Sequence, residues 1–137
     1  KTVTDITVFS YVSTLKLVEN AGVDLEKFNI SCEIIDCQSL IPFDLGNNIC
    51  ESIKKTNRVI IIDEDFSGGA SAYILDNLIN KQNIYDYLDS KPHTLSAQDH
   101  RPAYGTDGDY FSKPSIDEVF NKIYSIMNEL NPEKYPI

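Results

Sequence analysis

The chain has 137 residues, which suits one domain whose folding buries about two-thirds of the surface of the unfolded chain. Its formal net charge of −9 disfavours nucleic-acid and anionic-membrane partners, because clustered Lys and Arg side chains make those contacts. No apolar run approaches the roughly 20 residues of a membrane helix. Because the chain starts with neither Met nor a signal-peptide pattern, we expect residues 1–137 to be one domain of a longer protein.

The cysteines Cys32, Cys37 and Cys50 are odd in number and have no metal-ligand spacing. We therefore expect reduced thiols in a protein of the bacterial cytoplasm.

Strands and helices alternate along the first half of the chain. Residues 6–11 and 30–36 are typical of strands. Between them, Ser13 or Thr14 can cap a helix whose apolar stripe is Leu15, Val18, Ala21, Leu25 and Phe28. Asp44 can cap a second helix with an inner face of Leu45, Ile49 and Ile53. Residues 59–62 are four consecutive β-branched side chains, which indicates a strand covered on both faces in a parallel sheet.

The second half continues the alternation. Ser67-Gly68-Gly69 breaks the chain before a helix with apolar positions at Ile74, Leu75, Leu78 and Ile79. Residues 94–97 predict a weaker strand, and a loop runs from residue 99 to 114. Ser115 and Glu118 form a capping-box pattern at the start of a last helix, which Asn131-Pro132 ends. The pattern predicts a three-layer α/β/α domain with a mostly parallel sheet.

An acidic run, Asp63-Glu64-Asp65, follows the most apolar strand, and Tyr11 and Asp36 follow two others. Ligands bind beyond the carboxyl ends of strands in such sheets, so clustered carboxylates there could hold magnesium. The favoured interpretation is a solvated loop before a helix N-terminus, where negative charge is stabilising.

Three other features could carry chemistry. Gly68-Gly69 could cradle a phosphate, although a turn is the favoured interpretation because the pair lacks a phosphate-loop motif and follows acids. Asp107-Gly108-Asp109 lacks the remaining ligands of a calcium loop. His93 and His100 are the only histidines, and neither accompanies a recognisable nucleophile or zinc pattern. We expect no catalytic, cofactor or metal residue in the chain.

Several strings, taken together and in order, resemble the transketolase-type C-terminal domain of thiamine-diphosphate-dependent enzymes. They are DITVFSY at 5–11, ISCEIID at 30–36, SLIPFD at 39–44, KTNRV at 55–59, DED at 63–65 and YDYLD at 85–89. Two further strings, HRPAYG at 100–105 and DGDYFSKP at 107–114, are similar to the β-type part of bacterial branched-chain (2-oxoisovalerate) 2-oxoacid dehydrogenases. NPEKYP at 131–136 resembles the tail of members in which the α- and β-type parts are fused.

The resemblance implies a five-stranded sheet with one antiparallel strand, whereas the residue patterns alone predict four strands. It also implies that thiamine diphosphate and magnesium are bound by other domains of the enzyme, and that this domain serves subunit contacts, homodimer-type contacts and docking to a dihydrolipoyl acyltransferase core. Asp89, in the Tyr-Leu-Asp string, matches a residue that contacts the core in pyruvate-type relatives. The alternative for Asp89 is a turn residue.

Other functions stay open at this point. The same domain could belong to a pyruvate dehydrogenase, a transketolase or a deoxyxylulose-phosphate synthase. A free-standing regulatory module that binds a small anion at Gly68-Gly69 is the remaining alternative.

Overall fold

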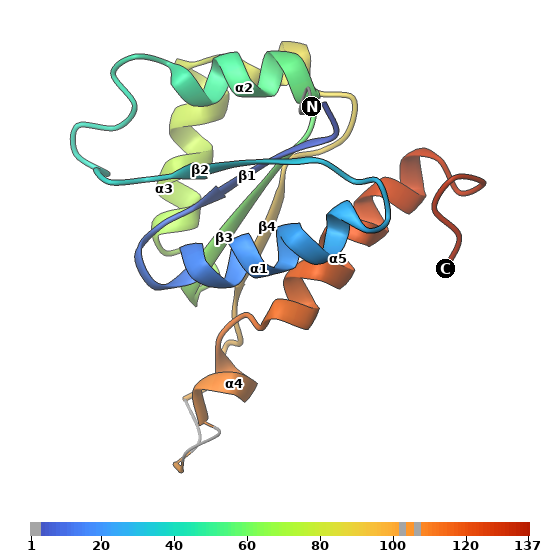
Figure 1. The fold of residues 1–137 in the computed structure, drawn as a ribbon. Coiled ribbons are helices and arrows are strands. Elements are labelled where there is room, and N and C mark those ends of the chain that lie inside the picture. The colour runs from blue at the N-terminus through green and yellow to red at the C-terminus, as the bar shows by residue number, and fades with distance from the viewer. Residues whose placement is uncertain (1–3, 102–103, 106–107) are drawn as a thin grey trace.

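The computed structural model describes residues 4–101, 104–105 and 108–137. A parallel sheet is covered on each face by helices (Figure 1). Within the described ranges, no helix combines the length and apolar character needed to cross a bilayer. The elements in chain order are β1 (Ile6–Ser10), the short helix η1 (Val12–Thr14), α1 (Leu15–Glu26), β2 (Cys32–Asp36), α2 (Asn48–Thr56), β3 (Val59–Phe66), α3 (Ala70–Asp76), η2 (Asn77–Lys81), η3 (Ile84–Tyr87), β4 (His93–Ala97), α4 (Gly108–Ser112) and α5 (Ile116–Leu130).

The described sheet has four strands in the order β2-β1-β3-β4, and every pair is parallel. The fifth, antiparallel strand implied by the resemblance is therefore not found among the described residues, and that expectation is corrected. After β4 the chain passes through α4 and enters α5, which packs beside α1 on one face of the sheet (Figure 1). The four strands predicted from the residue patterns are all confirmed.

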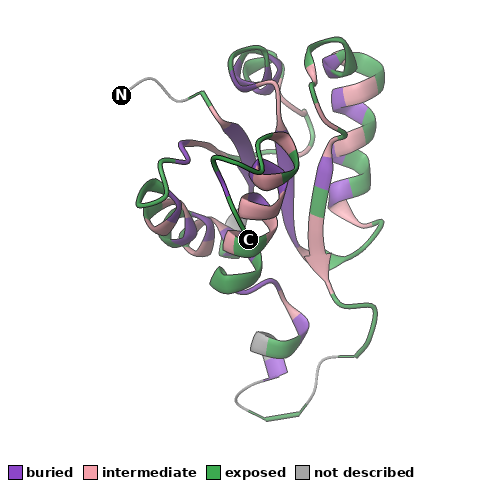
Figure 2. Cartoon of the chain, turned by 90° about the vertical axis from the view of Figure 1, so that its right-hand side faces the viewer, coloured by how far each residue is buried: buried purple, intermediate pink, exposed green. Residues whose placement is uncertain are grey.

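Two apolar cores lie on the two faces of the sheet, and Figure 2 shows the buried strands between the helices. Ile60 and Ile62 face α1 and α5, whereas Val59 and Ile61 face α2 and α3. All four of these side chains are fully buried, because helices cover both faces of β3, which lies between β1 and β4. The prediction of a strand covered on both faces is thus confirmed.

Two residues of the predicted apolar stripes, Leu45 and Phe28, are exposed. Leu45 is 82% exposed because α2 begins only at Asn48, so Leu45 belongs to the preceding loop. Phe28 is 49% exposed because α1 ends at Glu26. Its ring packs edge-on against Phe120 and Tyr124 of α5 instead of entering the sheet core.

Helix starts follow the predictions in part. Ser115 accepts a hydrogen bond from the backbone N–H of Glu118, and the Glu118 carboxylate accepts one from Ser115, so the capping box is confirmed. Asp44 accepts from the backbone N–H groups of Asn48 and Ile49, which caps α2 from the loop. The cap predicted at α1 is wrong: the Thr14 hydroxyl donates back to the Tyr11 carbonyl.

The three cysteines are free thiols, as expected. Burial is the main reason that the pKa of Cys32 rises to about 12, so this thiol stays protonated at neutral pH.

Candidate functional site

The carboxyl ends of β1 and β3 bring Tyr11 and Asp63 together. The Tyr11 hydroxyl donates a hydrogen bond to Oδ1 of Asp63, which is fully buried. Oδ1 also accepts from the backbone N–H of Asp65 at 2.8 Å, and Oδ2 accepts from that of Ser71 at 2.8 Å. Burial and the neighbouring Asp63 carboxylate raise the pKa of Tyr11 above its ordinary value. Asp63 therefore joins β1, β3 and the start of α3 from inside the protein.

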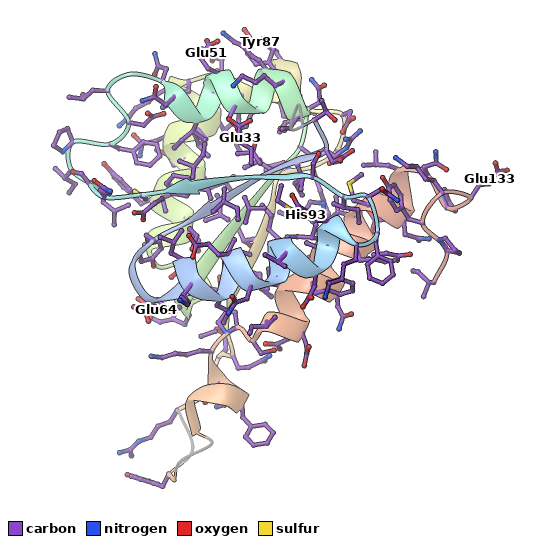
Figure 3. All side chains as sticks on the ribbon, in the orientation of Figure 1. Glu33, Glu51, Glu64, Tyr87, His93 and Glu133 are labelled. Atoms are coloured by element: carbon purple, nitrogen blue, oxygen red, sulfur yellow. The ribbon has the colours of Figure 1, made fainter. Side chains whose placement is uncertain are left out.

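The three acids of the run do not converge on one point. Glu64, labelled in Figure 3, lies on the opposite face of β3 and accepts from the Ser13 hydroxyl, with Lys113 Nζ 3.6 Å away. Asp65 accepts from the backbone N–H of Phe66. The run belongs to β3, so the expectation that it forms a solvated loop is corrected for the buried Asp63. The expected contact with a helix N-terminus is present, since Asp63 accepts from the Ser71 N–H at the start of α3. Within the described part of the chain, no group of three or more His, Cys, Asp or Glu side chains could hold a metal ion.

Asp36 lies apart from this cluster. It is exposed at the end of β2, the edge strand, and accepts a 3.4 Å hydrogen bond from Gln38. The structure thus brings together Tyr11 and Asp63 but not Asp36.

The glycine pair forms a turn between β3 and α3. Gly68 has a φ of +94°, in the left-handed region that favours glycine. A Cβ atom on Gly69 would lie 3.1 Å from Oδ2 of Asp65 and 3.3 Å from the Phe66 carbonyl oxygen. The N–H of Ser71 in the first turn of α3 is already used by Asp63. The turn interpretation of Gly68-Gly69 matches this geometry.

The two histidines lie in unlike surroundings. His93 starts β4 and is 5% exposed, and its Nε2 atom is buried without a hydrogen-bond partner. Burial lowers its pKa, and the positive charges of Lys122 and Lys91 act in the same direction. His100 is exposed, with Nδ1 3.0 Å from the Arg101 carbonyl oxygen. In the calcium-like string, Asp107 and the side chain of Asp109 lie outside the described part.

Asp89, the expected partner-binding residue, follows η3 on the surface. Its backbone N–H donates to the Asn57 carbonyl at 3.0 Å. Its side chain is 39% exposed, and Oδ2 lies 2.5 Å from Nη2 of Arg58. Asn57 has a φ of +59° and donates from its side chain to the Tyr87 carbonyl at 2.7 Å. The segment between α2 and β3 therefore holds the Tyr-Leu-Asp segment in place.

Aromatic side chains accompany Asp89. Tyr85 is 71% exposed and Tyr87 is 38% exposed, and Figure 3 shows Tyr87 beside α2. The Lys54 ammonium lies 5.1 Å from the centre of the Tyr87 ring. Tyrosine is enriched at protein interfaces, so these partly exposed rings suit an interaction surface.

Sequence reasoning missed the roles of Asn57 and Arg58. Asn just after a helix favours a left-handed residue, which was an available signal for the conformation of Asn57. Arg58 precedes the four apolar residues that begin β3, and nothing local in the sequence indicates that its guanidinium reaches a residue 31 positions later.

Two clefts lie away from Asp89. A cleft of about 550 Å³ separates the starts of α1 and α5, with Leu17, Glu64 and Ile116 in its lining. A second, of about 320 Å³, lies between β2 and the start of α2 and is lined in part by Phe9, Cys37 and Phe43.

The chain matches the protein family described as "Transketolase, C-terminal domain" over residues 1–112. The chain belongs to this family. The "Pyruvate dehydrogenase E1 component subunit beta" of Rickettsia bellii is 31% identical over 122 residues, which cover 88% of this chain and 37% of that protein. The chloroplastic subunit beta-2 of Arabidopsis thaliana is 39% identical over 94 residues, covering 69% of this chain and 23% of the relative. The chain thus covers only 23–37% of the length of these relatives.

Solved structures agree with this fold. A chain of a split-gene transketolase, described as an inactive beta4 tetramer, has a TM-score of 0.69 at 18% identity and covers 91% of this chain and 39% of its own length. Transketolase from Campylobacter jejuni has a TM-score of 0.59 at 17% identity, covering 91% of this chain and 17% of its own.

Proposed function

We propose that the chain is the C-terminal assembly domain of the decarboxylating component of a 2-oxoacid dehydrogenase. The observation that carries this proposal is the similarity over 88% of the chain to a β subunit of that component. In the proposed role, the domain makes subunit contacts, including homodimer-type contacts, and docks the enzyme on its dihydrolipoyl acyltransferase core in the bacterial cytoplasm.

Thiamine diphosphate and magnesium belong to other domains of the enzyme in this proposal. The Asp63 carboxylate, the most buried acid at the strand ends, already accepts from three protein donors. Such a carboxylate stabilises the fold and has little capacity left for a metal ion. The isolated domain should accordingly lack decarboxylase activity.

Pyruvate is the better-supported substrate, because the Rickettsia and Arabidopsis relatives are named pyruvate dehydrogenases. A branched-chain 2-oxoacid is the second candidate, favoured by the strings at 100–105, 107–114 and 131–136. Decarboxylation by the full-length enzyme, measured with pyruvate and with 3-methyl-2-oxobutanoate, decides between them. Activity with neither 2-oxoacid would remove the proposed enzyme class.

Asp89 is the proposed docking residue. Its partly exposed carboxylate can accept a charge-assisted hydrogen bond from a Lys or Arg of the core. Asp24 offers a matched control, since it is exposed on α1, in the other helical layer (Figure 1). Asp89→Asn should weaken core binding, whereas Asp24→Asn removes the same charge and should not.

A further inference from the structure

We propose that Arg58 is a positioning residue that presents the Asp89 carboxylate to a cationic group of the partner. The inference rests on the proposed docking function of Asp89. Arg58 lies in the KTNRV string at 55–59, and its contacts give a physical reason for the orientation of the docking carboxylate.

The Arg58 guanidinium is held by the protein on one side and holds Asp89 on the other. The side chain is only 18% exposed. Nη1 donates to the Asp5 carbonyl at 2.9 Å and to the Thr56 carbonyl at 3.4 Å, and Nη2 donates to Asp89 Oδ2 at 2.5 Å. Because the guanidinium is planar and its donor directions are fixed, its hydrogen bonds to the two carbonyls also set the position of the Asp89 carboxylate.

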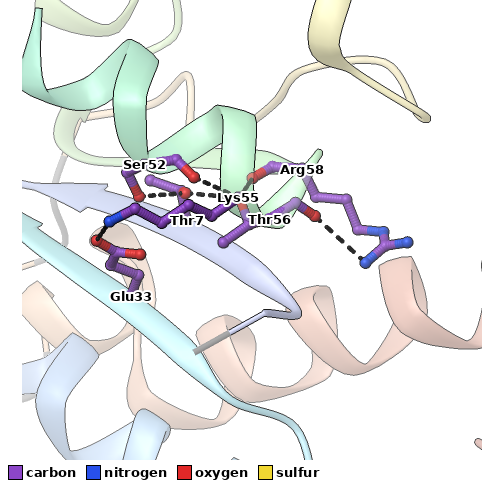
Figure 4. A network of polar contacts seen from close by, with 6 residues as sticks. All are labelled: Thr7, Glu33, Ser52, Lys55, Thr56 and Arg58. Carbon is purple, nitrogen blue, oxygen red and sulfur yellow. Dashed lines mark hydrogen bonds and ion pairs between the residues drawn. The ribbon is translucent and has the colours of Figure 1, made fainter. Parts of the chain in front are cut away.

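A buried hydroxyl network lies behind Arg58 (Figure 4). Thr7 Oγ1 of β1 lies 2.7 Å from Ser52 Oγ and 2.8 Å from Thr56 Oγ1, both on α2. Thr56 Oγ1 also donates to the backbone carbonyl of Arg58 at 3.1 Å. Because these hydroxyls are buried and mutually satisfied, they fix the backbone from which the Arg58 side chain extends.

Asp89 is consequently fixed at two levels. The Asn57 carbonyl holds its backbone N–H, and Arg58 holds Oδ2 of its side chain. A carboxylate has about four acceptor positions, so Oδ1 can still accept from a Lys or Arg of the partner. Ordering this side chain before binding removes an entropic cost that docking would otherwise include. Repulsion between Arg58 and the incoming cation opposes this effect, and the negative charge of Asp89, whose Oδ2 lies 2.5 Å from Nη2 of Arg58, offsets part of that repulsion.

The test measures the affinity of the full-length enzyme for its purified acyltransferase core by isothermal titration calorimetry. The variants are Arg58→Gln, Arg58→Lys, Asp89→Asn and the double variant Arg58→Gln/Asp89→Asn. Lys55→Gln is the matched control, because Lys55 is nearby and exposed and its ion pair is with Glu33 at 3.4 Å. The thermal unfolding midpoint of each variant shows whether it is folded.

Arg58→Gln should weaken core binding about 3- to 10-fold. Arg58→Lys should also weaken it, because an ammonium group lacks the fork that reaches the backbone carbonyls and the carboxylate together. In the Asp89→Asn background, Arg58→Gln should cause no further loss, and Lys55→Gln should leave the affinity unchanged.

Four outcomes would overturn the inference. Tighter binding by Arg58→Gln would make Arg58 a competitor of the partner. If Arg58→Gln weakened core binding equally in the unchanged protein and in the Asp89→Asn variant, Arg58 would have only a structural role. If Asp89→Asn weakened core binding but Arg58→Gln did not, the role of Arg58 would be disproved and the docking proposal would stand. If Asp89→Asn bound the core normally, the docking proposal itself would be disproved.

Discussion

The Asp63 carboxylate accepts a 2.8 Å hydrogen bond from the backbone N–H of Ser71, which ties the end of β3 to the first turn of α3. Asp63→Ala would leave this buried donor and that of Asp65 unsatisfied. We expect the free energy of unfolding, measured by urea denaturation, to fall by about 3 kcal/mol. Tyr11→Phe removes one donor only and should cost about 1 kcal/mol. Equal effects of the two variants would contradict the bridging role of Asp63.

The Thr7 hydroxyl joins β1 to α2 through Ser52 and Thr56. Thr7→Val keeps the shape of the side chain but leaves its buried partners with one hydrogen bond fewer. The free energy of unfolding should fall by roughly 1–2 kcal/mol in urea denaturation. Thr94→Val changes an exposed strand residue and should be nearly neutral. A neutral Thr7→Val would show that the network adds nothing to stability.

The buried imidazole of His93 makes stability depend on pH. Its folded-state pKa lies below the ordinary 6.5, through burial and through Lys122 on α5 and Lys91 before β4, with Glu129 on α5 opposing. Between the lowered pKa and 6.5 the unfolded chain binds more protons than the folded chain, so stability falls as pH drops through that window. The difference in unfolding free energy between pH 7 and pH 5 should shrink in His93→Gln.

His100→Gln is the control for this measurement, because His100 is exposed. It should keep the pH dependence of the unchanged protein. If His93→Gln kept the pH dependence of stability of the unchanged protein, His93 would not be its source.

The capping box of α5 should contribute measurable stability. Ser115→Ala removes the acceptor for the Glu118 N–H and should lower the free energy of unfolding by about 1 kcal/mol. Ser125→Ala lies within the same helix, away from its first turn, and should have little effect or a slight stabilising one. Thermal denaturation of both variants checks the difference, and equal midpoints would rule out the contribution of the cap.

Local patterns were sufficient for the elements that depend on local chemistry. The four β-branched residues at 59–62 predicted a strand buried on both faces, and the capping box predicted the start of α5. Leu45 was misplaced because apolar periodicity does not show where a helix begins, and the left-handed Asn47 delays the start of α2. Phe28 was misplaced because its ring contacts α5, which is distant in sequence.

The candidate site was predictable to a smaller extent. The resemblance singled out Asp89, but its ion pair with Arg58 depends on how α2, β3 and the segment after η3 pack. Asp63 was expected in a solvated loop, since an acidic run gives no indication that its first carboxylate is buried beneath α3. Both features arise from contacts between distant segments, which no spacing in the sequence encodes.

The most direct test of the assembly role uses Asp89→Ala in the full-length enzyme with two measurements on one preparation: binding to the acyltransferase core and decarboxylation of the free 2-oxoacid. The account predicts weaker core binding, about 10-fold or more for a charged interface pair, with an unchanged rate of free decarboxylation. Unchanged core binding, or a loss of free decarboxylation with core binding intact, would contradict it.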